Sequence, residues 1–141
     1  MTTDAITQLC CGPTFQFRDW PNPNVPDGAI GVYTIWDLEA RLIYVGMSGR
    51  QPRTDRVRWG LRTRLASHAA GRRSGDQFCV YVADRLVLPS LTTDQIAKIG
   101  QGELSLDALV RVYIHANLTY RFVTLDTTAG ARHVIHLLGW R

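Results

Sequence analysis

Apolar and polar residues follow two different periods along this chain, and the changes of period predict its elements. Two runs rich in β-branched and aromatic residues, at positions 29–36 and 41–46, are separated by four residues that suit a turn. So short a connection predicts an antiparallel hairpin. From residue 61 to residue 70, apolar residues recur at every fourth position, which predicts a helix with one apolar face.

The second half of the chain continues this mixture of periods. Residues 77–83 alternate in the manner of a strand, and residues 119–125 are again β-branched and aromatic. Residues 93–99, 105–115 and 131–138 predict helices, the second of which starts at a serine suited to cap it. The predicted fold class is therefore α+β, a small and largely antiparallel sheet of three to four strands flanked by helices.

The length of the chain, 141 residues, suits one compact domain. Residues 1–28 hold four of the six prolines, so we expect an irregular N-terminal arm that its three aromatic residues pin to the core. The domain itself is expected to span residues 29–141, with a helical insertion around residues 85–117.

Composition narrows the class of protein further. Apolar residues make up 45% of the chain and charged residues 20%, which is the balance of a globular domain and not of a disordered one. The three cysteines show no metal-ligand spacing and are interpreted as reduced thiols. No apolar run approaches the length of a membrane span, and the N-terminus lacks the pattern of a signal peptide. A cytoplasmic location without a membrane partner is therefore expected.

Two short motifs mark the predicted hairpin, and a third marks the helix that follows it. Gly31-Val32-Tyr33 and Tyr44-Val45-Gly46 are separated by ten residues, and Ser48 follows closely. The stretch from Leu61 to His68 reads Leu-x-x-Arg-Leu-x-x-His. Together these residues resemble the paired signature and the first helix of the GIY-YIG nuclease superfamily, with Val in place of Ile in each triplet. The resemblance covers residues 29–70 and implies an endonuclease that hydrolyses phosphodiester bonds in DNA.

The chemistry of four residues in these motifs suits that reaction. Facing strands of a hairpin can bring Tyr33 and Tyr44 onto one face of the sheet, and Arg64 and His68 project from one side of a helix. Cutting a phosphodiester needs an activated water and stabilisation of the phosphoryl charge. Arg64 suits the second task, and His68 titrates near neutral pH. Tyr33 could exchange a proton with water if its pKa fell from about 10.

The resemblance assigns a role to each of these four residues. It implies that Tyr33 activates the attacking water and that Tyr44 and Arg64 orient and stabilise the phosphate. It places His68 in the same site. The positions expected to shape the backbone of the site are Gly31, Gly46 and Ser48.

Arginines gather beside the predicted site. Fifteen of the sixteen basic residues are Arg, whose guanidinium can hold a phosphate through two parallel hydrogen bonds. Eight of them lie between positions 50 and 73 with a single acidic residue, so DNA is the expected partner, bound through its phosphates. Trp59 in this stretch is interpreted as an anchor for the loop, with stacking on a base as the alternative. Besides Arg64, the predicted contacts to nucleic acid are Arg50, Arg53, Arg56, Arg58, Arg62, Arg72 and Arg73.

The resemblance also implies a divalent metal, Mg²⁺ or alternatively Mn²⁺, held by a Glu on the helix after the last strand. That helix is expected at residues 128–140, which contain neither Glu nor Asp. Ile135 stands at the expected position, with His133 and His136 nearby, and Mg²⁺ prefers oxygen ligands to imidazole. The metal ligand is therefore left open. The carboxylates elsewhere that would have to supply it are Glu39, Glu103, Asp107 and Asp126.

Two functions follow from these patterns. The first is a metal-dependent DNA endonuclease, and the alternative is a nucleic-acid-binding module of the same fold with weakened or lost catalysis. A nuclease of DNA or RNA that acts only with a partner is a third interpretation. An active enzyme needs a metal-binding carboxylate from elsewhere in the chain, so the presence of such a carboxylate distinguishes the first function from the second. The oligomeric state and the sequence or structure of the DNA substrate stay open.

Overall fold

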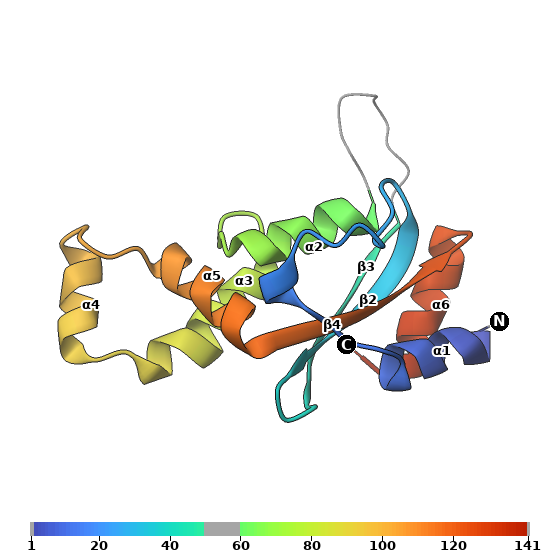
Figure 1. Cartoon of the computed structure of the whole chain (residues 1–141), viewed down its shortest axis with the longest axis horizontal. Coiled ribbons are helices and arrows are strands. Elements are labelled where there is room, and N and C mark those ends of the chain that lie inside the picture. The colour runs from blue at the N-terminus through green and yellow to red at the C-terminus, as the bar shows by residue number, and fades with distance from the viewer. Residues whose placement is uncertain (1, 50–59, 141) are drawn as a thin grey trace.

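The computed structural model describes residues 2–49 and 60–140. Within these ranges the chain forms a four-stranded antiparallel sheet with six α-helices around it (Figure 1), which confirms the α+β fold class. The strands are β1 (Phe15–Gln16), β2 (Ile30–Asp37), β3 (Leu42–Ser48) and β4 (Leu118–Leu125). The helices are α1 (Thr2–Cys11), α2 (Leu61–Ala70), α3 (Gln77–Val82), α4 (Thr93–Gly100), α5 (Leu106–Asn117) and α6 (Thr128–Leu138).

The sheet has the strand order β1-β4-β2-β3, so β2 lies inside it with a partner on each side. The predicted hairpin is confirmed, because β2 and β3 pair antiparallel with Tyr33 opposite Gly46 and Ile35 opposite Tyr44. On the other side of β2, Tyr33 lies opposite Phe122 of β4. Successive residues of β2 therefore point to opposite faces of the sheet, with Tyr33 and Ile35 on one face and Val32 on the other.

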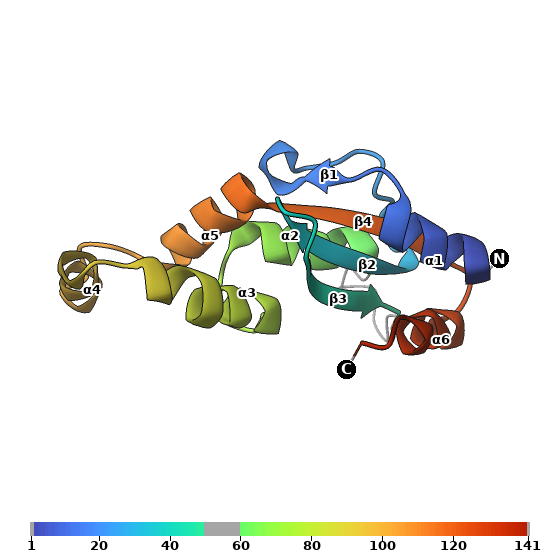
Figure 2. The ribbon, with the colours of Figure 1, turned by 90° about the horizontal axis from the view of Figure 1, so that it is seen from below.

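Each face of the sheet is covered by its own group of helices. Apolar residues of α2, α3 and α5 form one buried cluster with Tyr33 and Ile35. Residues of α1 and α6 form a second cluster with Val32 and Val45. Figures 1 and 2 show α1 and α6 at one end of the molecule and α4 at the opposite end. The side chain of Tyr33, a predicted catalytic residue, therefore lies on the face of the sheet that α2 covers.

The strand predicted at residues 77–83 is wrong, because this stretch begins with helix α3. Asp76 caps the helix, and its side chain accepts a hydrogen bond from the backbone N–H of Cys79. The buried residues Phe78, Cys79 and Val82 lie on one helical face. A stretch of only six or seven apolar residues fits both periods, and tertiary packing selected the helical one.

The irregular arm predicted at residues 1–28 is wrong for its first part, where Thr2–Cys11 form α1. The prolines on which that prediction was based all follow Gly12. Ahead of them Ala5 and Leu9, four residues apart, are buried against the sheet.

The expected attachment of the arm by its aromatic residues is confirmed. Phe17 is fully buried in the core. The ring centroids of Phe15 and Trp20 lie 5.7 and 6.0 Å from that of Tyr120. The arm is therefore part of the packed domain.

The helices predicted at 93–99, 105–115 and 131–138 are confirmed as α4, α5 and α6, and the strand at 119–125 as β4. Ser105 caps α5 through a hydrogen bond from the N–H of Ala108. The helical insertion also contains a π-helical turn, η2 (Ala83–Val87), and a 3₁₀ turn, η3 (Leu88–Ser90). None of the helices in the described ranges combines the length and the apolar character needed to span a membrane.

Helix α5 offers a direct test of this packing. Ile114 is fully buried in the cluster of α2, α3 and α5, whereas 63% of Val112 on the same helix is exposed. We expect Ile114→Ala to lower the free energy of unfolding by about 2–5 kcal/mol, because it leaves a cavity in the core. The matched change Val112→Ala should alter it by about 0.5 kcal/mol or less. Urea denaturation followed by circular dichroism measures both, and equal effects would contradict the assignment of the core.

Candidate functional site

The three aromatic residues of the predicted catalytic set meet where β2 and β3 pack against α2. The Tyr33 phenol oxygen lies 2.7 Å from Nε2 of His68. The Tyr44 ring centroid lies 6.5 Å from that of Tyr33 and 5.9 Å from that of His68. The structure therefore brings together residues from two strands and one helix, as their spacing predicted.

Backbone geometry at two glycines positions this cluster. Gly46 lies opposite Tyr33, and a Cβ at Gly46 would overlap the Tyr33 phenol, so only glycine leaves room for the ring. Helix α2 ends at Gly71 in the left-handed conformation, with a φ of 75°, and the Gly71 N–H donates to the carbonyl of His68. His68 therefore sits in the last turn of a helix with a defined end.

Arg64 lies one helical turn before His68 and is the exposed member of the set. Burial raises the pKa values of both Tyr33 and Tyr44, and the positive charge of Arg64 opposes this rise at each, so its guanidinium lies near the two phenols. Tyr33 and His68 are buried, and Tyr44 is half-buried. The cluster is therefore graded from a closed interior at His68 to an open edge at Arg64.

Asp76 is a member of this site that the sequence patterns did not reveal. Its Oδ2 lies 2.7 Å from Nδ1 of His68 and also accepts a hydrogen bond from the Ser67 hydroxyl. Its Oδ1 accepts from the N–H of Cys79 at 3.0 Å. The available signal was an aspartate just before an apolar stretch, which identifies a helix cap once that stretch is known to be helical.

The hydrogen bonds determine the protonation states of the buried chain. Burial alone would raise the pKa of Asp76, but hydrogen bonds from His68, Cys79 and Ser67 outweigh it and hold the pKa at about 2. Burial lowers the pKa of His68, more than the hydrogen bond and charge of Asp76 raise it. Near neutral pH, Asp76 is thus a carboxylate and His68 a neutral imidazole. Because the carboxylate only accepts, Nδ1 of His68 donates to Asp76, and Nε2 accepts from the Tyr33 phenol.

The two tyrosines are held in their protonated forms. Burial and the neighbouring Tyr44 raise the pKa of Tyr33 well above its usual range, against the opposing charge of Arg64. Burial also raises the pKa of Tyr44. A phenolate base at neutral pH would require a lowered pKa at Tyr33, and the structure raises this pKa instead. The hydrogen bond from the phenol to Nε2 makes His68 the proton acceptor nearest to Tyr33 among the described hydrogen bonds.

The other predicted backbone positions are close-packed. A Cβ at Gly31 would overlap the carbonyl oxygen of Val123 and meet the side chain of Leu61. Ser48 is buried opposite Gly31 at the end of β3. Both residues lie further from the β2–β3 turn than Tyr33 and Tyr44 do, so they shape the part of the sheet beside that cluster.

The arginines predicted to contact nucleic acid have different surroundings in the structure. Arg62 donates to the carbonyl oxygens of Asn22 and Val25 at 2.9 and 3.1 Å, so it holds the arm against α2. Arg73 pairs with Asp107 at 2.6 Å. Arg72 is exposed. The remaining predictions, Arg50, Arg53, Arg56 and Arg58, lie with Trp59 outside the described residues.

The carboxylates and histidines of the described residues are spread over the structure and are not gathered into one ligand cluster. No group of three or more His, Cys, Asp or Glu residues within 2–49 and 60–140 is arranged to hold a metal ion. Asp76 is buried, and both of its oxygens already accept hydrogen bonds. On α6, Ile135 packs against the second apolar cluster, and His133 and His136 are exposed.

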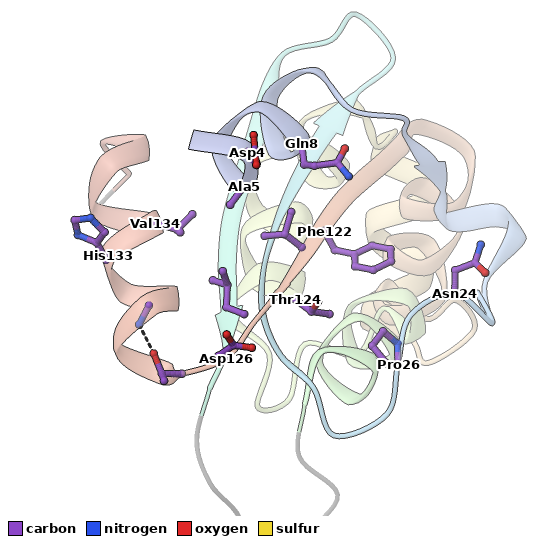
Figure 3. A pocket seen from close by; sticks show the side chains of 14 residues that line it. Asp4, Ala5, Gln8, Asn24, Pro26, Phe122, Thr124, Asp126, His133 and Val134 are labelled. Carbon is purple, nitrogen blue, oxygen red and sulfur yellow. Dashed lines mark hydrogen bonds between the residues drawn. The ribbon is translucent and has the colours of Figure 1, made fainter. Parts of the chain in front are cut away.

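The four alternative carboxylates lie elsewhere. Glu39 pairs with Arg41 in the β2–β3 turn, and Asp107 pairs with Arg73. Glu103 is exposed in the helical insertion. Asp126 lines a separate groove of about 770 Å³ over β4, between α1, α6 and residues 24–26 of the arm (Figure 3). Tyr33, Tyr44, Arg64 and His68 do not line that groove.

No protein family, no curated protein and no solved structure was found to match this chain.

Substitution of Gly46 tests the packing around Tyr33. We expect Gly46→Ala to lower the free energy of unfolding by about 1–3 kcal/mol, because the added methyl displaces the Tyr33 ring. Gly100, at the end of α4, is the matched control because a Cβ there meets open space. Gly100→Ala should leave stability unchanged or raise it by up to about 1 kcal/mol. Thermal and urea unfolding of both variants decide the point, and similar losses in the two would refute this packing.

Acidification should destabilise the protein through His68 before it does so through Asp76. The folded pKa of His68 lies below its unfolded value of about 6.5, so its contribution is complete above that value and is lost as pH falls. The Asp76 contribution persists until the pH falls below about 4 and is lost toward 2. Urea midpoints measured from pH 7.5 to pH 5.5 should therefore fall. His68→Gln should flatten this part of the profile, and an unchanged slope would contradict the assignment.

Proposed function

We propose that this chain is an endonuclease that hydrolyses phosphodiester bonds in DNA, with Tyr33, Tyr44, Arg64 and His68 as its catalytic residues. The observation that carries the proposal is the 2.7 Å hydrogen bond between the Tyr33 phenol and Nε2 of a neutral His68, beside Arg64. A proton carrier, a proton acceptor and a cation are thereby combined in one cluster. The resemblance of residues 29–70 to the GIY-YIG motifs supports the same function.

Hydrolysis in this site begins with a coupled movement of two protons. Water gives a proton to the Tyr33 oxygen as the phenol proton passes to Nε2 of His68, because the high pKa of Tyr33 disfavours a free phenolate. The hydroxide attacks phosphorus, and the bond from phosphorus to the leaving oxygen breaks. The leaving oxygen takes a proton from solvent, and His68 returns to solvent the proton that it received, so that the site is restored and one water is added across the bond. Arg64 stabilises the phosphoryl oxygens, and Tyr44 orients them.

Access to Tyr33 is part of the proposal. The phenol is fully buried, while Tyr44 is half-buried and Arg64 is exposed. DNA therefore meets Arg64 first, and movement of the Arg64 and Tyr44 side chains admits the phosphate and its water. The described residues hold no group of three or more His, Cys, Asp or Glu arranged for the divalent metal expected from the resemblance, and no step of the reaction is assigned to it.

A second function is favoured by the same burial. Complete enclosure of Tyr33 and His68 matches a nucleic-acid-binding module that retains the fold without turnover. In that module the buried hydrogen bonds stabilise the core, and the exposed arginines bind phosphates. The two functions differ in cleavage and agree in DNA binding.

Plasmid cleavage distinguishes them. The wild type, Tyr33→Phe, Arg64→Ala and the control Arg132→Ala are compared in Mg²⁺, in Mn²⁺ and in EDTA. Arg132 is exposed on α6, which covers the opposite face of the sheet. We expect Tyr33→Phe to cut about 10²–10⁴ times more slowly than wild type and Arg64→Ala about 10²–10³ times more slowly. The control should cut as the wild type does.

Gel-shift assays at two salt concentrations accompany the cleavage assay. Binding of all four proteins that weakens with salt, without cleavage by any of them in any condition, would establish the binding module instead. Cleavage by both site variants at the wild-type rate would overturn the assignment of the catalytic residues.

A further inference from the structure

We infer that Asp76 is the positioning residue of this site, holding the His68 imidazole so that its Nε2 faces the Tyr33 phenol as a proton acceptor. The inference deepens the proposed nuclease function and rests on it. The described hydrogen bonds of Asp76 go to Ser67, His68 and Cys79 and not to Tyr33. Its hydrogen bond to His68 is the contact through which it positions the site.

The imidazole is held at both nitrogens and on its faces. Asp76 Oδ2 and the Tyr33 oxygen each lie 2.7 Å from a different ring nitrogen of His68. The Phe78 ring packs 4.7 Å from the imidazole centroid, and the Tyr44 ring meets it nearly at right angles, at 5.9 Å. These contacts oppose the ring rotation that would carry Nδ1 away from Asp76 and Nε2 away from Tyr33.

The direction of the hydrogen bonds decides what the imidazole can do. A neutral imidazole carries one N–H, and the bond that this N–H makes determines which nitrogen is left to accept. A carboxylate at Nδ1 keeps the proton there and leaves the lone pair of Nε2 for the Tyr33 proton. With the proton on Nε2, the imidazole would donate to the phenol oxygen and could not accept from it. Asp76 therefore selects the tautomer on which the proton transfer depends.

Asp76 is itself held independently of His68. Its Oδ1 caps α3 through the Cys79 N–H, and the Ser67 hydroxyl donates to Oδ2. Only 3% of the residue is exposed, so its charge acts on His68 with little screening by water. The other titratable groups around the imidazole are Tyr33 on β2, Tyr44 on β3, Arg64 on α2 and Cys79 on α3.

A purely structural role for Asp76 as a helix cap is the alternative, and Asp76→Asn separates the two. Asparagine caps helices about as well as aspartate, so α3 keeps its cap. The side-chain amide can accept from Cys79 through its oxygen and then presents an N–H to Nδ1 of His68. The substitution therefore reverses the polarity of the second hydrogen bond. Asp76→Ser, another neutral capping residue, removes the carboxylate from Nδ1 of His68 and is the second variant if the asparagine variant does not fold.

The first measurement needs no activity. Nitrogen-15 NMR of the histidine side chains reports which ring nitrogen carries the proton, and a His68→Gln sample identifies the His68 signals. We expect the wild type to carry the proton on Nδ1 and Asp76→Asn to carry it on Nε2. The pKa of His68 should fall further in the variant, because the carboxylate that raises it is gone. An unchanged tautomer would overturn the inference.

The second measurement is plasmid cleavage by the same proteins, with Asp94→Asn on α4 as the control. Asp94 is exposed and undergoes the same chemical change far from the site. We expect Asp76→Asn to lower kcat by about 10²–10⁴ with KM for DNA within about twofold of wild type. Wild-type kcat in Asp76→Asn, or a loss confined to KM, would also overturn the inference. A wild type that does not cut, with a tautomer that changes as expected in Asp76→Asn, would refute the proposed function while confirming that Asp76 positions His68.

Discussion

The structure depends on burying a hydrogen-bonded polar chain, from Tyr33 through His68 to Asp76, inside an apolar core. A buried polar group without a partner is costly, and in the described residues no buried side-chain nitrogen or oxygen lacks one. Each member of the chain comes from a different element, β2, α2 or the start of α3. The hydrogen bonds therefore fix how the hairpin, the helix and the following turn are placed together. The candidate site and the core are the same assembly.

The motif residues therefore contribute both to the candidate site and to the packing of the core. Tyr33 faces Gly46 across the hairpin, and the missing side chain of Gly46 accommodates the tyrosine ring. Gly31 likewise allows β4 and α2 to approach β2. The spacing of the two triplets thus follows from strand register as much as from chemistry. Packing of the core alone would keep Tyr33, Gly46 and Gly31 at these positions, so their spacing is compatible with both proposed functions.

Local periodicity was sufficient where elements are long or joined by short turns, as in the β2–β3 hairpin and in α2. It failed at α3, because six residues with alternating apolar side chains satisfy either period. Because helix α3 was not predicted, Asp76 was not recognised as its cap or as a residue of the site. Its contact with His68 forms because the chain turns between α2 and α3. The protonation of Tyr33 was also beyond local reasoning. Its pKa rises because elements distant in sequence exclude water from the phenol.

Helix α4 stands apart from this tightly coupled interior. None of its residues is fully buried, and it contacts the core through the partly buried Ile99. A capping box between Thr92 and Gln95 stabilises its first turn locally. Its sequence is therefore constrained mainly by helix propensity and solubility, and substitutions there escape the packing that restricts β2 and α2. This end of the molecule is the place where fluorophores, affinity tags or inserted segments can be attached without disturbing the hydrogen-bonded interior.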